Sequence, residues 1–151
     1  SNDLTGVTDS TNLDTDYTRN KIRHIILPEM LKINGSLFPT MNRMERSLRS
    51  DSDFLEEMAA KALEEARCPG GYSAEALAAL PTPLQSRAIR MIFSAGGIAP
   101  SALRINTAAE ILAAGRGKFN PCRGKFFVVK RGAAFVMSEE QHYKKHEKIL
   151  P

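Results

Sequence analysis

Long apolar runs, paired cysteines and targeting segments are absent from this chain of 151 residues. No stretch of about 18 apolar residues occurs, so the sequence predicts no membrane-spanning helix. Two cysteines are too few for a disulfide framework or a zinc site, and they indicate reduced thiols in a cytoplasmic protein. No signal peptide is visible. Glycine and proline are too sparse for a low-complexity chain. What remains is a globular domain of ordinary size.

An initiator methionine is also missing, since the chain begins with Ser1 and Asn2. This start is typical of a cloning scar, so we expect an excised domain. Small polar residues that favour turns dominate residues 1–14. We therefore expect an arm or linker over 1–16, a helical domain over 17–138 that ends in a basic hairpin, and a polar tail over 139–151.

The net charge of +4 is unevenly distributed along the chain. Residues 1–66 carry 8 basic and 12 acidic side chains, whereas residues 67–151 carry 13 and 5. Such a split favours a polyanionic partner for the second part, although a solvated basic face is the commoner origin of such a pattern. The basic residues of the richest stretch, 104–131, are Arg104, Arg116, Lys118, Arg123, Lys125, Lys130 and Arg131, against the single acid Glu110.

Hydrophobic periodicity predicts an α+β fold that is mostly helical, with about five helices and a small C-terminal antiparallel β-hairpin or three-stranded sheet. The expected helices cover residues 16–27, 39–67, 74–80, 82–95 and 108–114, and the second of them is compatible with two shorter helices. Pro28 is expected to end the first helix. The methionines of 39–67 recur at helical spacing and are expected to fill the core. The expected strands are 125–130 and 133–137, with 118–120 as a third.

Two helix starts are predicted from capping chemistry. Thr82 is a candidate N-cap with Gln85 as its capping-box partner and Pro83 at the first helical position. Thr107 and Glu110 form the same pattern ahead of 108–114. Residues 68–72, which contain a proline and two glycines, are expected to form a loop.

The first predicted helix presents a polar face with chemistry suited to nucleic acid. Arg19 and Arg23 lie one turn apart and can offer bidentate donors to phosphate. Asn20 beside them can read a base edge or order a phosphate. Asp9 and Asn12 lie on a turn just ahead, where they can order a junction with a neighbouring domain. Helix capping and interdomain ion pairing are the structural alternative for the same residues.

The basic hairpin is the second candidate interface, because phosphate contacts supply most sequence-independent affinity for nucleic acid. Phe119, Phe126 or Phe127 can stack on bases, and strand alternation leaves this role to one face only. The alternative is that Phe126, Val128 and Phe135 simply form the core. The weaker candidates for phosphate contact are Arg87 and Arg90.

No metal site or nucleophilic centre is predicted. His142 and His146 are four residues apart with Glu147 following, but the order is not HExxH and a third ligand is lacking. Cys68 and Cys122 lack a matched histidine and aspartate for covalent catalysis.

Residues 9–28, DSTNLDTDYTRNKIRHIILP, resemble a motif of the tRNA(Ile)-lysidine synthetase family of PP-loop ATPases. In that motif an acidic-Ser-x-Asn turn leads into a Tyr-x-Arg-Asn-x-Ile-Arg helix ended by proline. Weaker likenesses of pattern and order extend over FLEEMA, LPTPLQSRAIRMIF and the Lys/Arg-rich hairpin. The matching positions of the motif are Asp9, Ser10, Asn12, Tyr17, Arg19, Asn20, Ile22, Arg23 and Pro28.

The resemblance implies the tRNA-recognition domain of a cytoplasmic, ATP-dependent ligase that joins L-lysine to the wobble cytidine of tRNA(Ile) through an adenylated intermediate. It also implies that ATP and Mg²⁺ are bound by an upstream PP-loop domain with an SGGxDS-type signature. The glycine-rich candidates here are CPGGYS, AGGIAP and GRGK, and none fits that signature. We therefore expect no catalytic residue and no activity in this chain alone. The residues expected to contact tRNA are Arg19, Arg23, Arg87, Arg90, Arg116, Lys118, Arg123, Lys125, Lys130 and Arg131.

Other functions remain open at this point. A helical adaptor for protein association would use the amphipathic, methionine-rich helix of residues 41–66. A DNA-binding regulator would use residues 82–95, but the flanking helices lack helix-turn-helix spacing. The sequence leaves the oligomeric state open, a homodimer included. It also leaves open whether a further C-terminal domain follows.

Overall fold

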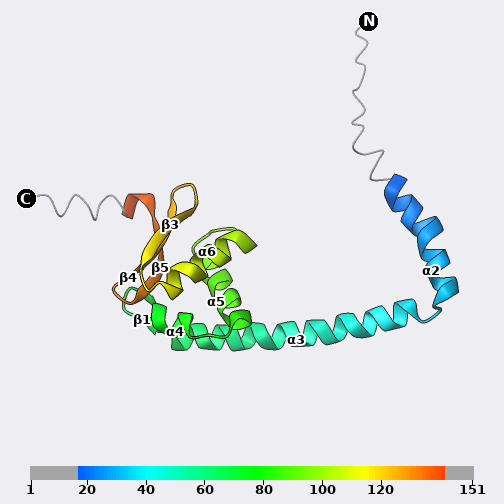
Figure 1. The fold of residues 1–151 in the computed structure, drawn as a ribbon, viewed down its shortest axis with the longest axis horizontal. Coiled ribbons are helices and arrows are strands. Elements are labelled where there is room, and N and C mark those ends of the chain that lie inside the picture. The colour runs from blue at the N-terminus through cyan, green and yellow to red at the C-terminus, as the bar shows by residue number, and fades with distance from the viewer. Residues whose placement is uncertain (1–16, 142–151) are drawn as a thin grey trace, which may run out of the picture. The chain divides into compact units, whose positions relative to one another are not determined.

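The computed structural model describes residues 17–141 of the chain and confirms the predicted α+β class (Figure 1). The chain divides into two compact units, residues 1–49 and 50–151. The helical elements are η1 (Ile22–Ile26), α2 (Leu27–Ile33), α3 (Leu37–Glu65), α4 (Ala74–Ala78), α5 (Thr82–Ala95) and α6 (Ala102–Ala113). The strands are β1 (Arg67–Cys68), β2 (Gly71–Ser73), β3 (Gly117–Cys122), β4 (Lys125–Lys130) and β5 (Ala133–Ser138).

Pro28 does not end the first helix, contrary to expectation. The chain is helical from Tyr17, widens into the π-helical η1, and continues through Pro28 into α2. Leu27 N–H bonds to the carbonyl of Ile22, five residues back. A wide turn of this kind is one of the known ways a helix absorbs a local disruption, here directly before a residue that lacks an N–H. The break predicted at Asn34 is confirmed, and its Oδ1 accepts a hydrogen bond from Ser36 N–H at 3.0 Å.

Helix α3 is one uninterrupted helix of 29 residues rather than two. Its methionines do not fill a core, which corrects the prediction: Met41, Met44 and Met58 are 49%, 57% and 38% exposed. Within the described part of the first unit, no buried residue is found on η1, α2 or the first residues of α3. Periodicity identified an apolar face correctly but could not show whether another layer covers it.

The five strands form one antiparallel sheet in the order β1-β2-β5-β4-β3. The predicted hairpin and third strand are confirmed as β4, β5 and β3. The loop predicted over 68–72 is wrong, because β1 and β2 form a short hairpin there and extend the sheet beyond β5. Strands of two and three residues are too short to show a period of two in the sequence.

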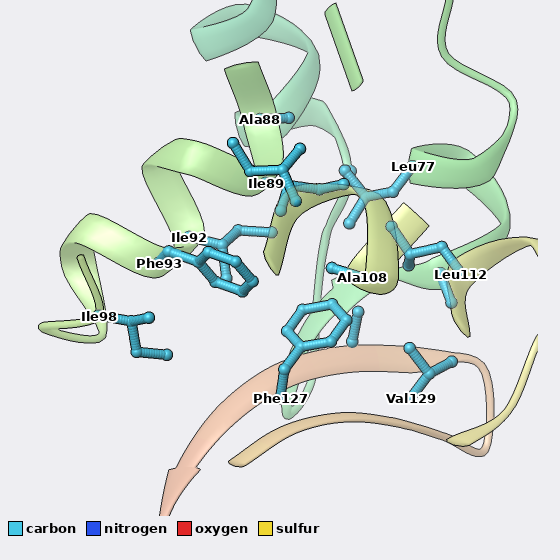
Figure 2. Packing of buried hydrophobic residues seen from close by; sticks show 14 residues of the cluster. Leu77, Ala88, Ile89, Ile92, Phe93, Ile98, Ala108, Leu112, Phe127 and Val129 are labelled. Carbon is cyan, nitrogen blue, oxygen red and sulfur yellow. The ribbon is translucent and has the colours of Figure 1, made fainter. Parts of the chain in front are cut away.

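The core of the second unit lies between one face of the sheet and helices α4, α5 and α6, as Figure 2 shows. Phe93 of α5 and Phe127 of β4 are fully buried, with ring centroids 5.6 Å apart and planes at 84°. Phe119 of β3 packs edge-on against both rings. Phe119 and Phe127, two of the proposed base-stacking residues, are therefore committed to the core.

The opposite face of the sheet carries Phe126, Val128 and Phe135, for which a place in the core was the alternative to base stacking. Val128 is 7% exposed, but the flanking Phe126 is only half-buried, and so is its diagonal neighbour Phe135. None of these three belongs to the cluster between sheet and helices, to which Val129 and Ala134 contribute. Both faces of β4 are apolar, so composition alone did not distinguish the helix-covered face from the other.

Helix α5 begins at Thr82 with Pro81 as its N-cap, so the predicted capping box at Thr82 and Gln85 is wrong. The amide of Gln85 instead donates to the carbonyl of Leu77 at 3.0 Å, which ties α5 to the end of α4. That end of α4 comes two residues earlier than expected, at Ala78.

Helix α6 begins at Ala102, well before the capping box predicted at Thr107 and Glu110. Ser101 is the N-cap, and its hydroxyl accepts a hydrogen bond from the backbone N–H of Arg104 at 3.4 Å. Thr107 lies inside the helix and donates to the carbonyl of Leu103 at 3.0 Å. A threonine in this position bonds back along the helix, so its presence does not mark a start.

Candidate nucleic-acid interface

The first candidate site is the polar face of the N-terminal helix. Arg19, Asn20 and Arg23 are all exposed, and the two arginines have no acidic partner among residues 17–141. The guanidinium groups are thus available to an external anion such as phosphate. Asp9 and Asn12 lie outside the described residues.

The second candidate site is a stretch free of acidic residues. Between Glu110 and Glu139 the sequence contains no aspartate or glutamate and six basic residues. This stretch contains β3, β4 and β5, the contiguous half of the sheet. An anion that approaches these strands meets no negative side chain from the strands themselves. The six basic residues are Arg116, Lys118, Arg123, Lys125, Lys130 and Arg131.

Strand register divides these cations between the two ends of the sheet. Gly117 pairs with Val129, so Arg116 and Lys130 flank the same end of the β3–β4 ladder. Arg131, in the turn to β5, lies at that end as well, with a φ of 55°. All three side chains belong to exposed residues. They form a compact group that we call the basic end.

Arg123 lies at the other end of the strands, in the turn between β3 and β4. Because β4 is six residues long, about 20 Å separate that turn from the basic end. The hairpin cations therefore do not form one patch that a single phosphate could contact. Arg123 is exposed and faces solvent separately.

Lys125 is engaged inside the protein. Its Nζ donates to the carbonyls of Gly96 at 2.6 Å and Gly97 at 2.9 Å, at the C-terminus of α5. A cation there is favoured by the helix dipole and satisfies carbonyls that have no partner within the helix. Gly97 has a φ of 66°, and a Cβ at this position would collide with the Lys125 ammonium group. Lys125 thus joins β4 to α5.

We expect Lys125→Ala to lower the free energy of unfolding by about 2 kcal/mol, since a charge-assisted contact with two carbonyls is lost. Urea unfolding followed by circular dichroism measures the change. Lys130→Ala is the matched control, because Lys130 is exposed and leaves the same strand at its other end. Equal unfolding midpoints for the two variants would contradict the structural role of Lys125.

Lys118 lies on the face of the sheet that points away from the helices. Its Nζ is 5.8 Å from the centroid of the Phe126 ring, an aromatic side chain on the neighbouring strand. Lys118 pairs in register with Val128. A cation and an aromatic ring therefore share this face.

Arg87 and Arg90 of α5 differ in their surroundings. Arg87 Nε lies 3.3 Å from Glu56 Oε2, and its Nη1 donates to the carbonyl of Pro83. Arg87 is therefore occupied in joining α5 to α3. Arg90 is exposed and has no acidic partner in the described part of the chain, so it keeps its charge available.

Arg67 is a cation that the sequence analysis did not single out. Its guanidinium lies over the Tyr72 ring at 5.5 Å, and the hydrogen bond to Glu64 raises the pKa of Arg67 above its ordinary value. Because Arg67 already pairs with Glu64, it is a poor ligand for phosphate. No group of three or more potential metal ligands occurs within residues 17–141, and His142 and His146 lie outside this range.

Comparisons with known proteins show what this chain is similar to. Residues 73–122, from β2 to the end of β3, match the family model described as the TilS substrate binding domain. A tRNA(Ile)-lysidine synthase of Geobacillus kaustophilus is 30% identical over 73% of this chain and 25% of its own length. That of Thermobifida fusca is 34% identical over 72% of this chain and 33% of its own length.

The chain spans about a quarter to a third of the length of these curated relatives. A further relative, the tRNA(Ile)-lysidine synthase of Mycolicibacterium paratuberculosis, is 34% identical over 62% of this chain and 30% of its own length. The family model and the relatives point to the same family as the motif of residues 9–28. The chain therefore belongs to the tRNA(Ile)-lysidine synthetase family and contains its substrate-binding domain.

Proposed function

We propose that this chain is the tRNA-recognition domain of an ATP-dependent tRNA(Ile)-lysidine synthetase. The observation that carries the proposal is the overlap of the substrate-binding-domain match, residues 73–122, with the start of the acid-free stretch of the sheet. In the whole enzyme, L-lysine would be joined to the wobble cytidine of tRNA(Ile) through an adenylated intermediate. We place the recognition domain at residues 17–138, preceded by an arm over 1–16 and followed by a polar tail over 139–151.

ATP and Mg²⁺ would be bound by a part of the enzyme outside this chain. The arrangement of the glycines supports this: CPGGYS forms the β1–β2 hairpin, AGGIAP follows α5, and GRGK joins α6 to β3. Phosphate-binding loops of nucleotide-dependent enzymes lead from a strand into a helix whose N-terminus binds the phosphates. AGGIAP and GRGK follow helices, and the helix after CPGGYS, α4, has only five residues. The chain alone would then bind tRNA without adenylating it.

The proposed tRNA contacts are the exposed arginines of the first helix, Arg90, the basic end, Arg123 and Lys118. A cytoplasmic location follows from a tRNA substrate. No helix among the described residues is long and apolar enough to cross a membrane. Whether the enzyme is a homodimer stays an open prediction.

A salt titration of tRNA binding tests the proposal on the chain itself. We expect affinity to fall steeply with salt, and the slope of log K against log salt to decrease by about one for each phosphate-contacting cation removed. The triple variant Arg116→Gln, Lys130→Gln, Arg131→Gln should therefore lose roughly three units of slope. The control variant Lys32→Gln, Arg49→Gln, Lys61→Gln removes the same number of positive charges from helices α2 and α3. Salt-insensitive binding, or equal slopes for both variants, would contradict the proposal.

Protein association is the second candidate, and the exposed apolar side chains of the first unit favour it. Ile25 and Ile33 are 59% and 88% exposed, and Leu48 is 60% exposed. Large exposed apolar side chains of this kind are found on surfaces that bind another protein. An adaptor without RNA affinity would show no tRNA binding at any salt concentration, so the same titration separates the two functions.

A further inference from the structure

The face of the sheet that points away from the helices combines aromatic, apolar and basic side chains. Strand alternation assigns every second residue to this face, because Phe127, Val129 and Ala134 point into the core. We call it the outer face. Its described residues on the three long strands are Lys118 of β3, Phe126, Val128 and Lys130 of β4, and Ala133, Phe135 and Met137 of β5.

Phe135 occupies the centre of the outer face. It pairs with Val128 on one side, and on the other side it lies beside Gly71 of β2. Gly71 has a φ of 150°, and a Cβ there would collide with the carbonyl oxygen of Ala134. This position therefore requires glycine, so no side chain from β2 stands next to the Phe135 ring. The ring remains half-buried instead of being covered from both strands.

Two lysines share the outer face with Phe135, and β3, β4 and β5 contribute no acidic residue. Lys130 lies diagonally across the β4–β5 ladder from Phe135, at a Cα separation of about 7 Å. Lys118 lies across the β3–β4 ladder from Val128, which is the direct partner of Phe135. The basic end borders the same face. An anionic ligand with a flat, weakly polar part satisfies both features, whereas a purely apolar partner would leave the charges of the basic end without a counter-ion.

We propose that the outer face binds an unpaired nucleotide of the RNA substrate, with its base stacked on Phe135 and its phosphates near Lys130 and the basic end. Aromatic side chains on exposed sheets receive splayed-out bases in this way, and a base-paired stem cannot offer them. This inference rests on the proposed tRNA-recognition function. It adds that the domain contacts a single-stranded part of the tRNA as well as its backbone.

The absence of tryptophan from the chain allows a direct test. Phe135→Trp introduces a single indole on the outer face, and base stacking on it should quench its fluorescence. Leu103→Trp is the matched control, because Leu103 is 78% exposed on α6, which packs on the opposite face of the sheet. With a tRNA(Ile) transcript at saturation, we expect quenching of the first variant only. A blunt-ended RNA duplex without unpaired nucleotides should leave the fluorescence of both variants unchanged.

A second pair of variants separates stacking from packing. Phe135→Leu should weaken tRNA affinity about tenfold, which is the range for losing one base–aromatic stack, and Phe135→Tyr should restore it. Circular dichroism checks that both variants are folded. This inference is overturned if the Phe135→Trp variant binds tRNA without quenching, or if the Phe135→Leu variant binds tRNA with full affinity. Either result leaves the proposed function intact. Failure of the unsubstituted chain to bind tRNA would overturn both.

Discussion

Phe127→Ala is expected to destabilise the second unit by about 3–5 kcal/mol. The total free energy of unfolding of a domain of this size is typically about 5–15 kcal/mol, so the variant loses a large part of it. Phe127 is 0% exposed and contacts both Phe93 and Phe119 through edge-to-face ring packing. Its removal leaves a cavity where β3, β4 and α5 meet.

Differential scanning calorimetry and urea unfolding measure this loss. Phe54→Ala is the matched control: it removes the same side chain from α3, where Phe54 is 61% exposed, and should change stability little. The strands that carry the basic residues lose their support together with the core, so tRNA binding should weaken in parallel with unfolding. Similar unfolding midpoints for Phe127→Ala and Phe54→Ala would contradict the assignment of the core to this face of the sheet.

The double variant Arg19→Ala, Arg23→Ala is expected to reduce lysidine formation roughly 100-fold in the full-length enzyme that we propose contains this chain. Both arginines are exposed on the polar face of the N-terminal helix and have no acidic partner among the described residues. Their hydrogen bonds to phosphate would be charge-assisted, and each such bond contributes about 1.5–3 kcal/mol. Each single variant should show part of the effect.

Single-turnover modification of tRNA(Ile), with saturating ATP and lysine, measures this reduction. Arg46→Ala provides the control, because Arg46 is an exposed arginine of α3 without a described ion pair. Unchanged single-turnover rates in both single variants would remove Arg19 and Arg23 from the proposed site. If saturating tRNA fully restores the modification rate, the two arginines contribute to tRNA binding rather than to the reaction itself.

Local signals predicted the elements that carry strong patterns of their own. The hairpin of β4 and β5 was predicted from two apolar, β-branched and aromatic runs around Arg131 and Gly132, and the structure confirms it. The capping boxes at Thr82 and Thr107 were wrong, since side-chain hydrogen bonding is decided by which partner is nearest in the fold. Gln85, for example, bonds to the end of α4, a contact outside its own helix.

In the candidate site, too, some features were predicted from the sequence and others were decided by the fold. Composition identified the acid-free, basic stretch, but all its cations were treated as equivalent. The fold shows that Lys125 of β4 binds the C-terminus of α5, that Arg87 is held by Glu56, and that Arg123 lies far from the basic end. These distinctions depend on contacts between residues about 30 apart in sequence, which no local pattern contains.

The sequence by itself determined the family, the α+β class and the charge separation, because each depends on residue identity and short-range order. Only the tertiary structure decided which face of β4 is buried by helices, where the basic residues gather, and that Phe126 and Phe135, rather than Phe119 or Phe127, lie on the outer face. Both faces of that strand are apolar, so which face the helices cover depends on how distant segments pack together, and the choice required the assembled core.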